Sequence, residues 1–292
     1  MRSSLQTYVR RFPVNMGKHR LVSLLWKPLV PASGPVDTEL LNADLRLTCD
    51  LNQFIQRQIF YFGAFEPEAC ELWFRFAQRA AVVFDVGANV GLYSLLAAKA
   101  NLRATIHAFE PTPAVVASFQ QNVQLNDLEN IALNPVAVGK TNGIASLHTC
   151  AGADGTNEGM NFVSENGAGD PNPEMAVPVV SLNHYCQTRG IEKIDLMKID
   201  IEGGEYDALM GAESLIRRQA IKCIFIELAE WAANRNGNST RDIKRFLVDA
   251  GYQLSQIQGR RLQPLSLEGT NNLGTAVAFT QDCTFIHSNG DN

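Results

Sequence analysis

From residue 82 onward, short apolar runs alternate with segments whose apolar residues recur at helical spacing. The run Val82 to Val86 predicts a buried strand, and Leu92, Leu95 and Leu96 predict a helix directly after it. Regular alternation of strands and helices predicts an α/β fold, a doubly wound parallel sheet with helices on both faces. The other expected strands cover residues 105–109, 131–138, a short stretch around 147, 194–199 and 221–228, and the other expected helices cover 112–125, a segment ending near 218, and 240–250.

The last part of the chain has a different connection pattern. Residues 252–257 and 275–280 are two apolar runs that we expect to pair antiparallel and to close the sheet. Gly251 lies between the preceding helix and this pair, where glycine commonly ends a helix.

The first 65 residues are expected to form an accessory segment, and residues 66–292 the main domain. Residues 1–30 contain six basic residues and no acid, interleaved with apolar residues. This basic arm is expected either to pack as a helix on the main domain or on a second subunit, or to bind an anionic surface. Residues 45–51 alternate as a strand does, and Glu66-Pro67 indicates the start of a helix.

Residues 151–176 interrupt the strand and helix rhythm with five glycines and two prolines. This composition predicts a long loop with one turn near 160–163. Loops of such length inside a compact domain are uncommon, and they are either functional or unstructured. A lid over an acceptor and an unstructured span both fit the sequence.

Composition narrows the function classes. The chain has 292 residues, a formal charge of −5 and six scattered cysteines without a Cys-x-x-Cys pair. The acidic balance argues against nucleic acid as a partner, and the cysteine spacing argues against a zinc ribbon. No apolar run reaches the roughly 20 residues that a transmembrane helix needs, and no leader pattern is present, so we expect a cytoplasmic protein with reduced cysteines.

The first predicted strand runs into a glycine turn, FDVGANVG, that has the geometry of a nucleotide-cofactor site. Glu110 ends the next strand, 25 residues after Asp85, and an acid there can accept hydrogen bonds from both hydroxyls of a ribose. A glycine turn of this kind also occurs for packing alone. The expected cofactor-binding residues are Asp85, Gly87, Asn89, Gly91 and Glu110.

The turn fits the dinucleotide fingerprint poorly, because Asn89 and Leu92 stand where that fingerprint needs glycine. A ligand without a diphosphate fits better. S-adenosylmethionine is such a ligand, with its amino-acid end held by backbone amides at the helix start and its ammonium near Asp85. A nicotinamide-dependent oxidoreductase is the alternative function.

A second charged block, KIDIEGGE, follows the predicted strand 194–199. Strand alternation places Lys198, Asp200 and Glu202 on one side, at the carboxyl edge of the sheet. Asp200 is the favoured general base or metal-orienting carboxylate, with Glu202 as the second choice. Glu227 ends the neighbouring strand, and carboxylates from two strand ends suit Mg²⁺. Alternatively, Lys198 only neutralises a carboxylate and Glu205 only starts the next helix.

Three further residues are candidates by position alone. His148 and His184 are possible helpers for a weak carboxylate base, although an isolated histidine is more often structural. Tyr93 either lines the methionine end of the cofactor pocket or belongs to the core.

Four motifs over residues 60–230 together resemble the FkbM family of S-adenosylmethionine-dependent methyltransferases: FDVGANVGLYS, HAFEP, IDLMKIDIEGGEYDALMGA and IFIEL. The resemblance implies a Rossmann-like class I methyltransferase fold and O-methylation of a hydroxyl on a sugar, glycan or other small natural product. It also implies that an extra N-terminal segment is common. The chain departs from the family at Ser181-Leu182-Asn183-His184, where relatives often have Leu-Asp-Asp. A catalytically silent partner protein is a third hypothesis, and a homo-oligomer is compatible with the sequence.

Overall fold

The structure is a computed structural model that describes residues 6–7, 9–10, 22, 34–40, 43–148, 151–152, 155–156, 161–164, 175–268 and 272–287. Most of the basic arm and most of the loop expected at 151–176 lie outside the described residues. No helix in the described ranges is both long and apolar enough to cross a bilayer. The five described cysteines are buried and free of disulfides.

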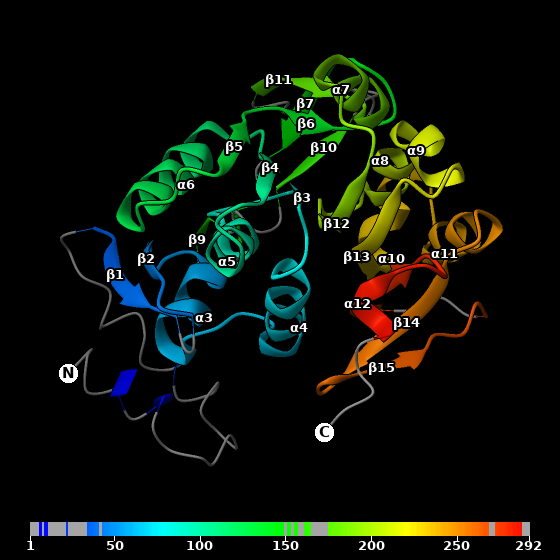
Figure 1. Cartoon of the computed structure of the whole chain (residues 1–292). Coiled ribbons are helices and arrows are strands. Elements are labelled where there is room, and N and C mark those ends of the chain that lie inside the picture. Colours follow the sequence, from blue (N-terminus) through cyan, green and yellow to red (C-terminus); the bar gives the residue numbers. More distant parts are fainter. Residues whose placement is uncertain are drawn as a thin grey trace.

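The centre of the molecule is an eight-stranded sheet (Figure 1). Five neighbouring strands are parallel, and β16 is antiparallel to both β13 and β14. The expected antiparallel closing pair is thereby confirmed, and β15 extends it by one strand. In spatial order the strands are β15 (Arg261–Pro264), β14 (Gln253–Gln258), β16 (Asn272–Phe279), β13 (Ile221–Ala229), β12 (Ile194–Ile199), β3 (Val82–Val86), β4 (Thr105–Phe109) and β5 (Ile131–Asn134).

Helices cover both faces of this sheet, because its central strands are apolar on both sides. Val83 packs with the helices of one face, whereas Phe84 packs with those of the other face. The first face carries α4 (Pro67–Ala77), α5 (Leu92–Ala100), α6 (Pro113–Leu125) and the short α12 (Thr284–His287). The second face carries α7 (Leu182–Arg189), α8 (Glu205–Gly211), α9 (Glu213–Arg217) and α11 (Thr240–Asp249).

Two helices begin with residues that favour a helix start. Pro67 occupies the first turn of α4, where its missing N–H costs nothing. Ser239 and Asp242 form a capping box at the start of α11. The helix expected to end near residue 218 is two helices, α8 and α9, which meet at Ala212.

A separate four-stranded sheet lies at the top of Figure 1. It corrects three expectations. The strand expected over 131–138 is two strands in two different sheets, because β5 stays in the large sheet while β6 (Ala137–Val138) pairs with β11. The short strand around Leu147 belongs to this second sheet, and the turn expected at 160–163 is instead the start of a strand. Its strands are β10 (Phe162–Ser164), β7 (Gly143–His148), β11 (Met175–Val180) and β6.

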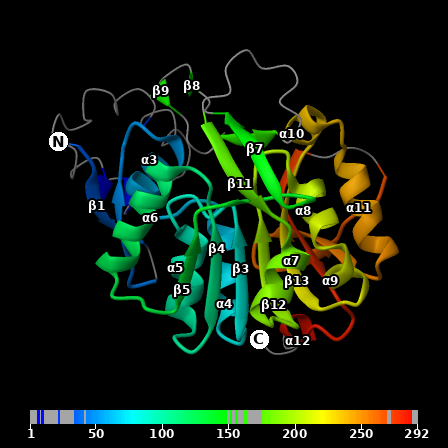
Figure 2. The same cartoon turned by 90° about the horizontal axis from the view of Figure 1, so that it is seen from above.

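The N-terminal segment packs on the α4–α5–α6 face. It contributes β1 (Val36–Glu39), β2 (Arg46–Cys49) and α3 (Phe54–Phe62), which lie on the opposite side of the molecule from α11 in both views (Figures 1 and 2). Leu47 and Ile59 are fully buried in the same core as Trp73 of α4. Arg10 donates hydrogen bonds to the carbonyl oxygens of Glu39 and Phe60, which fixes this part of the basic arm.

A short hairpin and two short helices lie outside these layers. A two-residue hairpin, β8 (Ala151–Gly152) with β9 (Gly155–Thr156), lies within the region expected to be a loop. Helix α10 (Glu230–Ala233) and the 3₁₀ helix η2 (Asn234–Asn236) follow β13 directly.

Candidate active site

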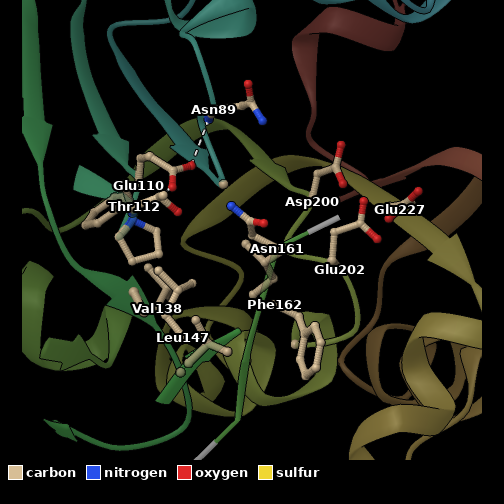
Figure 3. A pocket seen from close by; sticks show the side chains of 18 of the residues that line it. Asn89, Glu110, Thr112, Val138, Leu147, Asn161, Phe162, Asp200, Glu202 and Glu227 are labelled. Atoms are coloured by element: carbon tan, nitrogen blue, oxygen red, sulfur yellow. Dashed lines mark hydrogen bonds between the residues drawn. The ribbon is translucent and has the colours of Figure 1, made fainter. Parts of the chain in front are cut away.

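A cleft of about 1100 Å³, partly open to solvent, lies at the carboxyl ends of β3 and β12 (Figure 3). Strand order reverses here, since β4 and β5 extend the sheet on the β3 side and β13 extends it on the β12 side. Open α/β sheets bind their ligands at such switch points. The four-stranded sheet supplies a facing wall with Val138, Leu147 and Phe162.

The described lining of the cleft is acidic. It contains six carboxylate side chains and no lysine, arginine or histidine. The six are Glu66, Glu110, Asp200, Glu202, Asp207 and Glu227. A cleft with this lining favours a cationic ligand and disfavours a polyanionic one.

Gly87 allows the segments that follow the parallel strands β3 and β12 to pack closely at the floor of the cleft. Its φ is +82°, and a Cβ there would lie 1.9 Å from the backbone oxygen of Asp200. No other residue type fits, because both the conformation and the space exclude a side chain. The glycine therefore positions the end of β12 against the end of β3.

Gly91 and Asp85, both expected to bind cofactor, lie behind the wall of the cleft. A Cβ on Gly91 would meet the Phe119 ring at 2.2 Å, so this glycine serves the packing of α5 on α6. Asp85 is 1 % exposed, and it accepts a hydrogen bond of 2.6 Å from the Ser94 hydroxyl. The sequence could not separate these positions from Gly87, because all three lie close together at the end of β3 and in the turn after it.

The backbone amides of the glycine turn already have acceptors inside the protein. Gly87 and Ala88 both donate to the carbonyl oxygen of Phe109, and Gly91 donates to Ala88. Asn89 donates to Glu110, and Val90 donates to the Asn89 side chain. All five amides of residues 87–91 therefore have acceptors within the protein, and the expectation that they hold the ligand stays a prediction.

Glu110 does line the cleft, at the carboxyl end of β4. Its Oε1 accepts a 2.9 Å hydrogen bond from the Thr112 amide, and its Oε2 accepts a 3.1 Å bond from the Asn89 amide (Figure 3). Glu110 is thus held by two backbone amides, beside Gly87 and Asn89 in the cleft lining.

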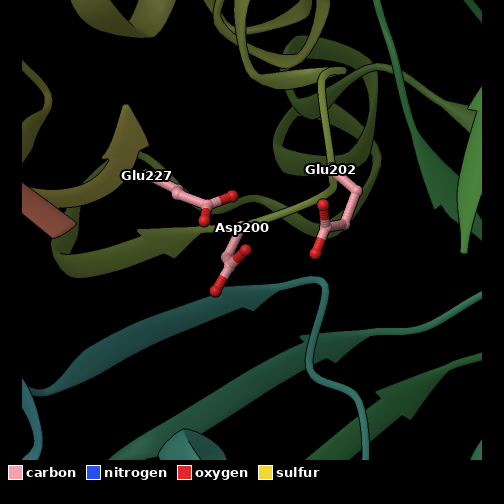
Figure 4. Close-up of side chains that lie close together, drawn as sticks. All are labelled: Asp200, Glu202 and Glu227. Atoms are coloured by element: carbon pink, nitrogen blue, oxygen red, sulfur yellow. The ribbon is translucent and has the colours of Figure 1, made fainter. Parts of the chain in front are cut away.

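Asp200, Glu202 and Glu227 come together at the other end of the cleft (Figure 4). One carboxylate oxygen from each lies within 4.8 Å of the other two. Glu227 extends from β13, and Asp200 follows the last residue of β12. The sequence prediction that these acids meet is confirmed by the geometry. Glu202 is not on an extended strand as expected, because β12 ends at Ile199 and Glu202 has a φ of +58°.

The three carboxyls differ in acidity. Burial, together with the charges of Asp200 and Glu205, raises the pKa of Glu202 to about 8. Burial and the same neighbouring acids raise the pKa of Glu227 to about 10. Burial alone would raise the pKa of Asp200 as well, but the Lys198 ammonium more than offsets it and the pKa is lowered. One ionised carboxylate therefore stands beside two carboxyls that tend to keep their protons.

Lys198 is a partner of Asp200 and is not part of the cleft lining. Its Nζ lies 2.5 Å from Asp200 Oδ2 and 4.4 Å from the centre of the Tyr93 ring, and the residue is only 4 % exposed. Lys198 therefore neutralises Asp200, which is the alternative role that the sequence allowed. Tyr93 belongs to the core beneath it and donates a 2.8 Å hydrogen bond to Glu66.

Glu205 holds the turn that carries Glu202. It is 3 % exposed, and its carboxylate accepts hydrogen bonds from the amides of Ile201 and Gly203. It also begins α8, as the alternative interpretation expected.

The histidine candidates do not reach the cleft lining. His184 is exposed on α7, and His148 is buried with its ring stacked on Phe162. The departure from the family pattern at 181–184 is also outside the cleft. Ser181 caps α7, and the Asn183 side chain accepts a hydrogen bond from the Leu215 amide.

Sequence reasoning missed a second group of lining residues. Glu66 was interpreted only as a helix start, yet it has a φ of +47° and faces the cleft. Ile55 and Phe65 bring the N-terminal segment to the same wall. Three more lining residues come from segments without a periodic pattern in the sequence: Asn161, Phe162 and Asn236. The pairing of β10 with β7 brings Asn161 and Phe162 to the cleft.

Comparisons with known proteins identify the family of this chain. The model of the methyltransferase FkbM domain matches residues 85–254, more than half of the chain. A curated relative, 31-O-demethyl-FK506 methyltransferase FkbM of Streptomyces tacrolimicus, is 29 % identical over 186 residues, covering 55 % of this chain and 68 % of the relative. Methyltransferase 1 of Beauveria bassiana is 27 % identical over 145 residues, covering 45 % of this chain and 58 % of the relative.

Among solved structures, an S-adenosylmethionine-dependent methyltransferase from Agrobacterium tumefaciens aligns at 10 % identity with a TM-score of 0.46. The alignment covers 86 % of this chain and 71 % of that one. The class I methyltransferase fold therefore rests on the strand order, with its reversed β16, and on the matched domain. With the glycine turn, the acid after β4 and the charged block after β12 all inside the matched residues, the chain belongs to the FkbM methyltransferase family.

Proposed function

We propose that this protein is an S-adenosylmethionine-dependent O-methyltransferase that acts on a hydroxyl of a sugar, glycan or other small natural product. The observation that carries the proposal is the acidic cleft at the switch point, which has six carboxylates and no cationic side chain in its described lining. S-adenosylmethionine carries a sulfonium and an ammonium, so such a lining attracts it. A nicotinamide dinucleotide carries a diphosphate, which the same lining repels.

Glu110 is proposed to bind the ribose of the cofactor. Its two oxygens are fixed by the amides of Asn89 and Thr112, so little conformational entropy is lost when the hydroxyls bind. Gly87 and Asn89, in the same wall, are proposed to contact the remainder of the cofactor.

Glu202 is proposed as the general base. A bound sulfonium methyl group is already electrophilic, so the protein has to orient the acceptor oxygen and remove its proton. Asp200 is a poor base, because Lys198 stabilises its ionised form. Glu202 lies in the cleft with a buried oxygen, Oε2, that has no hydrogen-bond partner among the described residues, and its raised pKa makes it the stronger base.

Mg²⁺ binding is a second candidate role for Asp200, Glu202 and Glu227. Three carboxylates with oxygens within 4.8 Å, two of them with buried oxygens that lack partners, suit a hard divalent cation. Such a cation would stabilise the ionised form of an acceptor hydroxyl. Calorimetric titration with Mg²⁺ tests this role, and the absence of binding to the wild-type protein rejects it.

The proposed function is tested by calorimetric titration with S-adenosylmethionine, its demethylated product and NADH. We expect the first two to bind and NADH not to bind. Glu110→Ala should weaken binding by about 1–3 kcal/mol through lost charge-assisted hydrogen bonds. Glu268→Ala, an exposed acid outside the cleft lining, is the matched control. Binding of NADH without S-adenosylmethionine would reverse the assignment.

Acceptor chemistry is tested separately by following formation of the demethylated product with a panel of hydroxylated sugars and aromatic alcohols. The relative from Streptomyces tacrolimicus is named for an O-demethylated natural product, which supports a hydroxyl acceptor here. Methylation of amines but of no hydroxyl would reject the O-methyltransferase assignment.

A further inference from the structure

Arg235, in η2, lies between two aromatic rings at the rim of the cleft. Its guanidinium carbon is 4.7 Å from the centre of the Phe162 ring and 4.5 Å from that of the Trp231 ring. Phe162 is itself part of the cleft lining, and so is Asn236, the next residue after Arg235. The arginine is exposed, so it stands at the boundary between the cleft and solvent.

This arrangement leaves the hydrogen-bonding edge of Arg235 available. The guanidinium carbon lies over both rings, and a guanidinium carries five N–H donors in its plane. No oxygen of the described residues forms a hydrogen bond or ion pair with it. Its charge does reach the site, because it opposes the burial and neighbouring acids that raise the pKa of Glu202.

The described lining of the cleft offers no cationic side chain to an anionic group of the acceptor. It has six acidic side chains, and Lys198 behind it already pairs with Asp200. An acceptor that carries a carboxylate therefore finds a cationic partner at the rim, in Arg235, while its hydroxyl enters toward Glu202. A stacked arginine with a free planar edge matches a carboxylate through two parallel hydrogen bonds.

We propose that Arg235, held against Phe162 and Trp231, selects acceptors that carry a carboxylate in addition to the hydroxyl to be methylated. This inference rests on the proposed function and adds the substrate class: a hydroxy acid of sugar or aromatic type. The contact between Arg235 and Phe162 also joins η2 to β10 of the four-stranded sheet. The position of Arg235 therefore depends on both of these elements.

The test compares acid and alcohol pairs that differ at one position. Methyl glucuronide is compared with methyl glucoside, and 4-hydroxybenzoate with 4-hydroxybenzyl alcohol, by titrating each into protein saturated with S-adenosylhomocysteine. At least one acid should bind the wild-type protein about tenfold or more tightly than its alcohol, in the range of a charge-assisted bidentate pair. Arg235→Gln should remove the preference, and Arg235→Lys should restore only part of it, because lysine lacks the planar edge.

Arg241→Gln is the matched control, since Arg241 is exposed on α11 and outside the cleft lining. It should keep the preference for the acid. Equal or undetectable binding of all four compounds to wild-type protein, or a preference that survives Arg235→Gln, overturns the inference. Because S-adenosylhomocysteine binding is measured first, failure at that step counts against the proposed function and is distinguished from failure of the Arg235 assignment.

Discussion

Lys198 Nζ lies 2.5 Å from Asp200 Oδ2, and the side chains of the pair are 5 % and 25 % exposed. The ammonium also lies over the Tyr93 ring, so a single cation is held between an aromatic face and a carboxylate. This ion pair keeps Asp200 ionised in a cluster whose other two members have raised pKa values. The ion pair therefore leaves Asp200 ionised, while Glu202 and Glu227 tend to keep their protons.

Breaking this pair should be costly. Lys198→Met leaves Asp200 charged and partly buried beside Glu227, so we expect the free energy of unfolding to fall by roughly 3 kcal/mol. Urea denaturation of the purified variant measures the change. Lys222→Met is the control, because Lys222 pairs with Asp282, whose side chain is 67 % exposed, and its loss should cost less than about 1 kcal/mol. Equal losses in the two variants would contradict the argument.

The raised pKa of Glu202 predicts an alkaline rise in methyl transfer. Below pH about 8 the carboxyl keeps its proton and cannot accept another, and above that value it is ionised and can act as the base. The rate with any accepted hydroxyl should therefore increase as pH rises through about 8. Carboxyl ¹³C resonances measured across the same pH range give an independent readout, in which Glu202→Gln should delete the signal that titrates near 8. A wild-type spectrum without such a signal contradicts the assignment.

Gly87→Ala should abolish cofactor binding. The added Cβ would meet the Asp200 carbonyl oxygen at 1.9 Å, so the segment after β3 could not stay packed against the end of β12. Gly237→Ala is a matched control, because Gly237 has a φ of +72° but no atom within 4 Å of the added Cβ. That control should lose only about 1–2 kcal/mol of stability from the left-handed conformation. Calorimetry with S-adenosylhomocysteine measures the loss of binding, and thermal unfolding measures the loss of stability. Normal binding by Gly87→Ala would refute the role of the close contact between Gly87 and Asp200.

Glu205 should stabilise the turn at residues 201–204, which carries Glu202. Glu205→Ala leaves the amides of Ile201 and Gly203 without their acceptor, and unpaired groups of this kind cost about 1–3 kcal/mol. Amide hydrogen exchange should show faster exchange at residues 201–204, while α11 keeps its protection. Unchanged exchange in the turn would show that other contacts hold it.

The sequence by itself determined the alternation that builds the large sheet. The apolar runs at 82–86, 105–109, 194–199 and 221–228 are strands in the structure, because segments buried on both faces of a sheet need apolar residues throughout. The charged block after β12 and Glu110 after β4 were predictable for the same reason. Polar residues directly after a buried strand lie at the edge where ligands bind.

Only the tertiary structure decided which of these residues face the cleft. Asp85, Gly87 and Gly91 lie close together in the sequence, at the end of β3 and in the turn after it. Contacts with other segments place Gly87 at the floor of the cleft and Gly91 against Phe119. The pairing of Phe162 with β7 and the stacking of Arg235 depend on contacts between distant residues, which leave no periodic trace in the sequence. Local patterns reflect burial along each element, whereas the site is formed where separate elements meet.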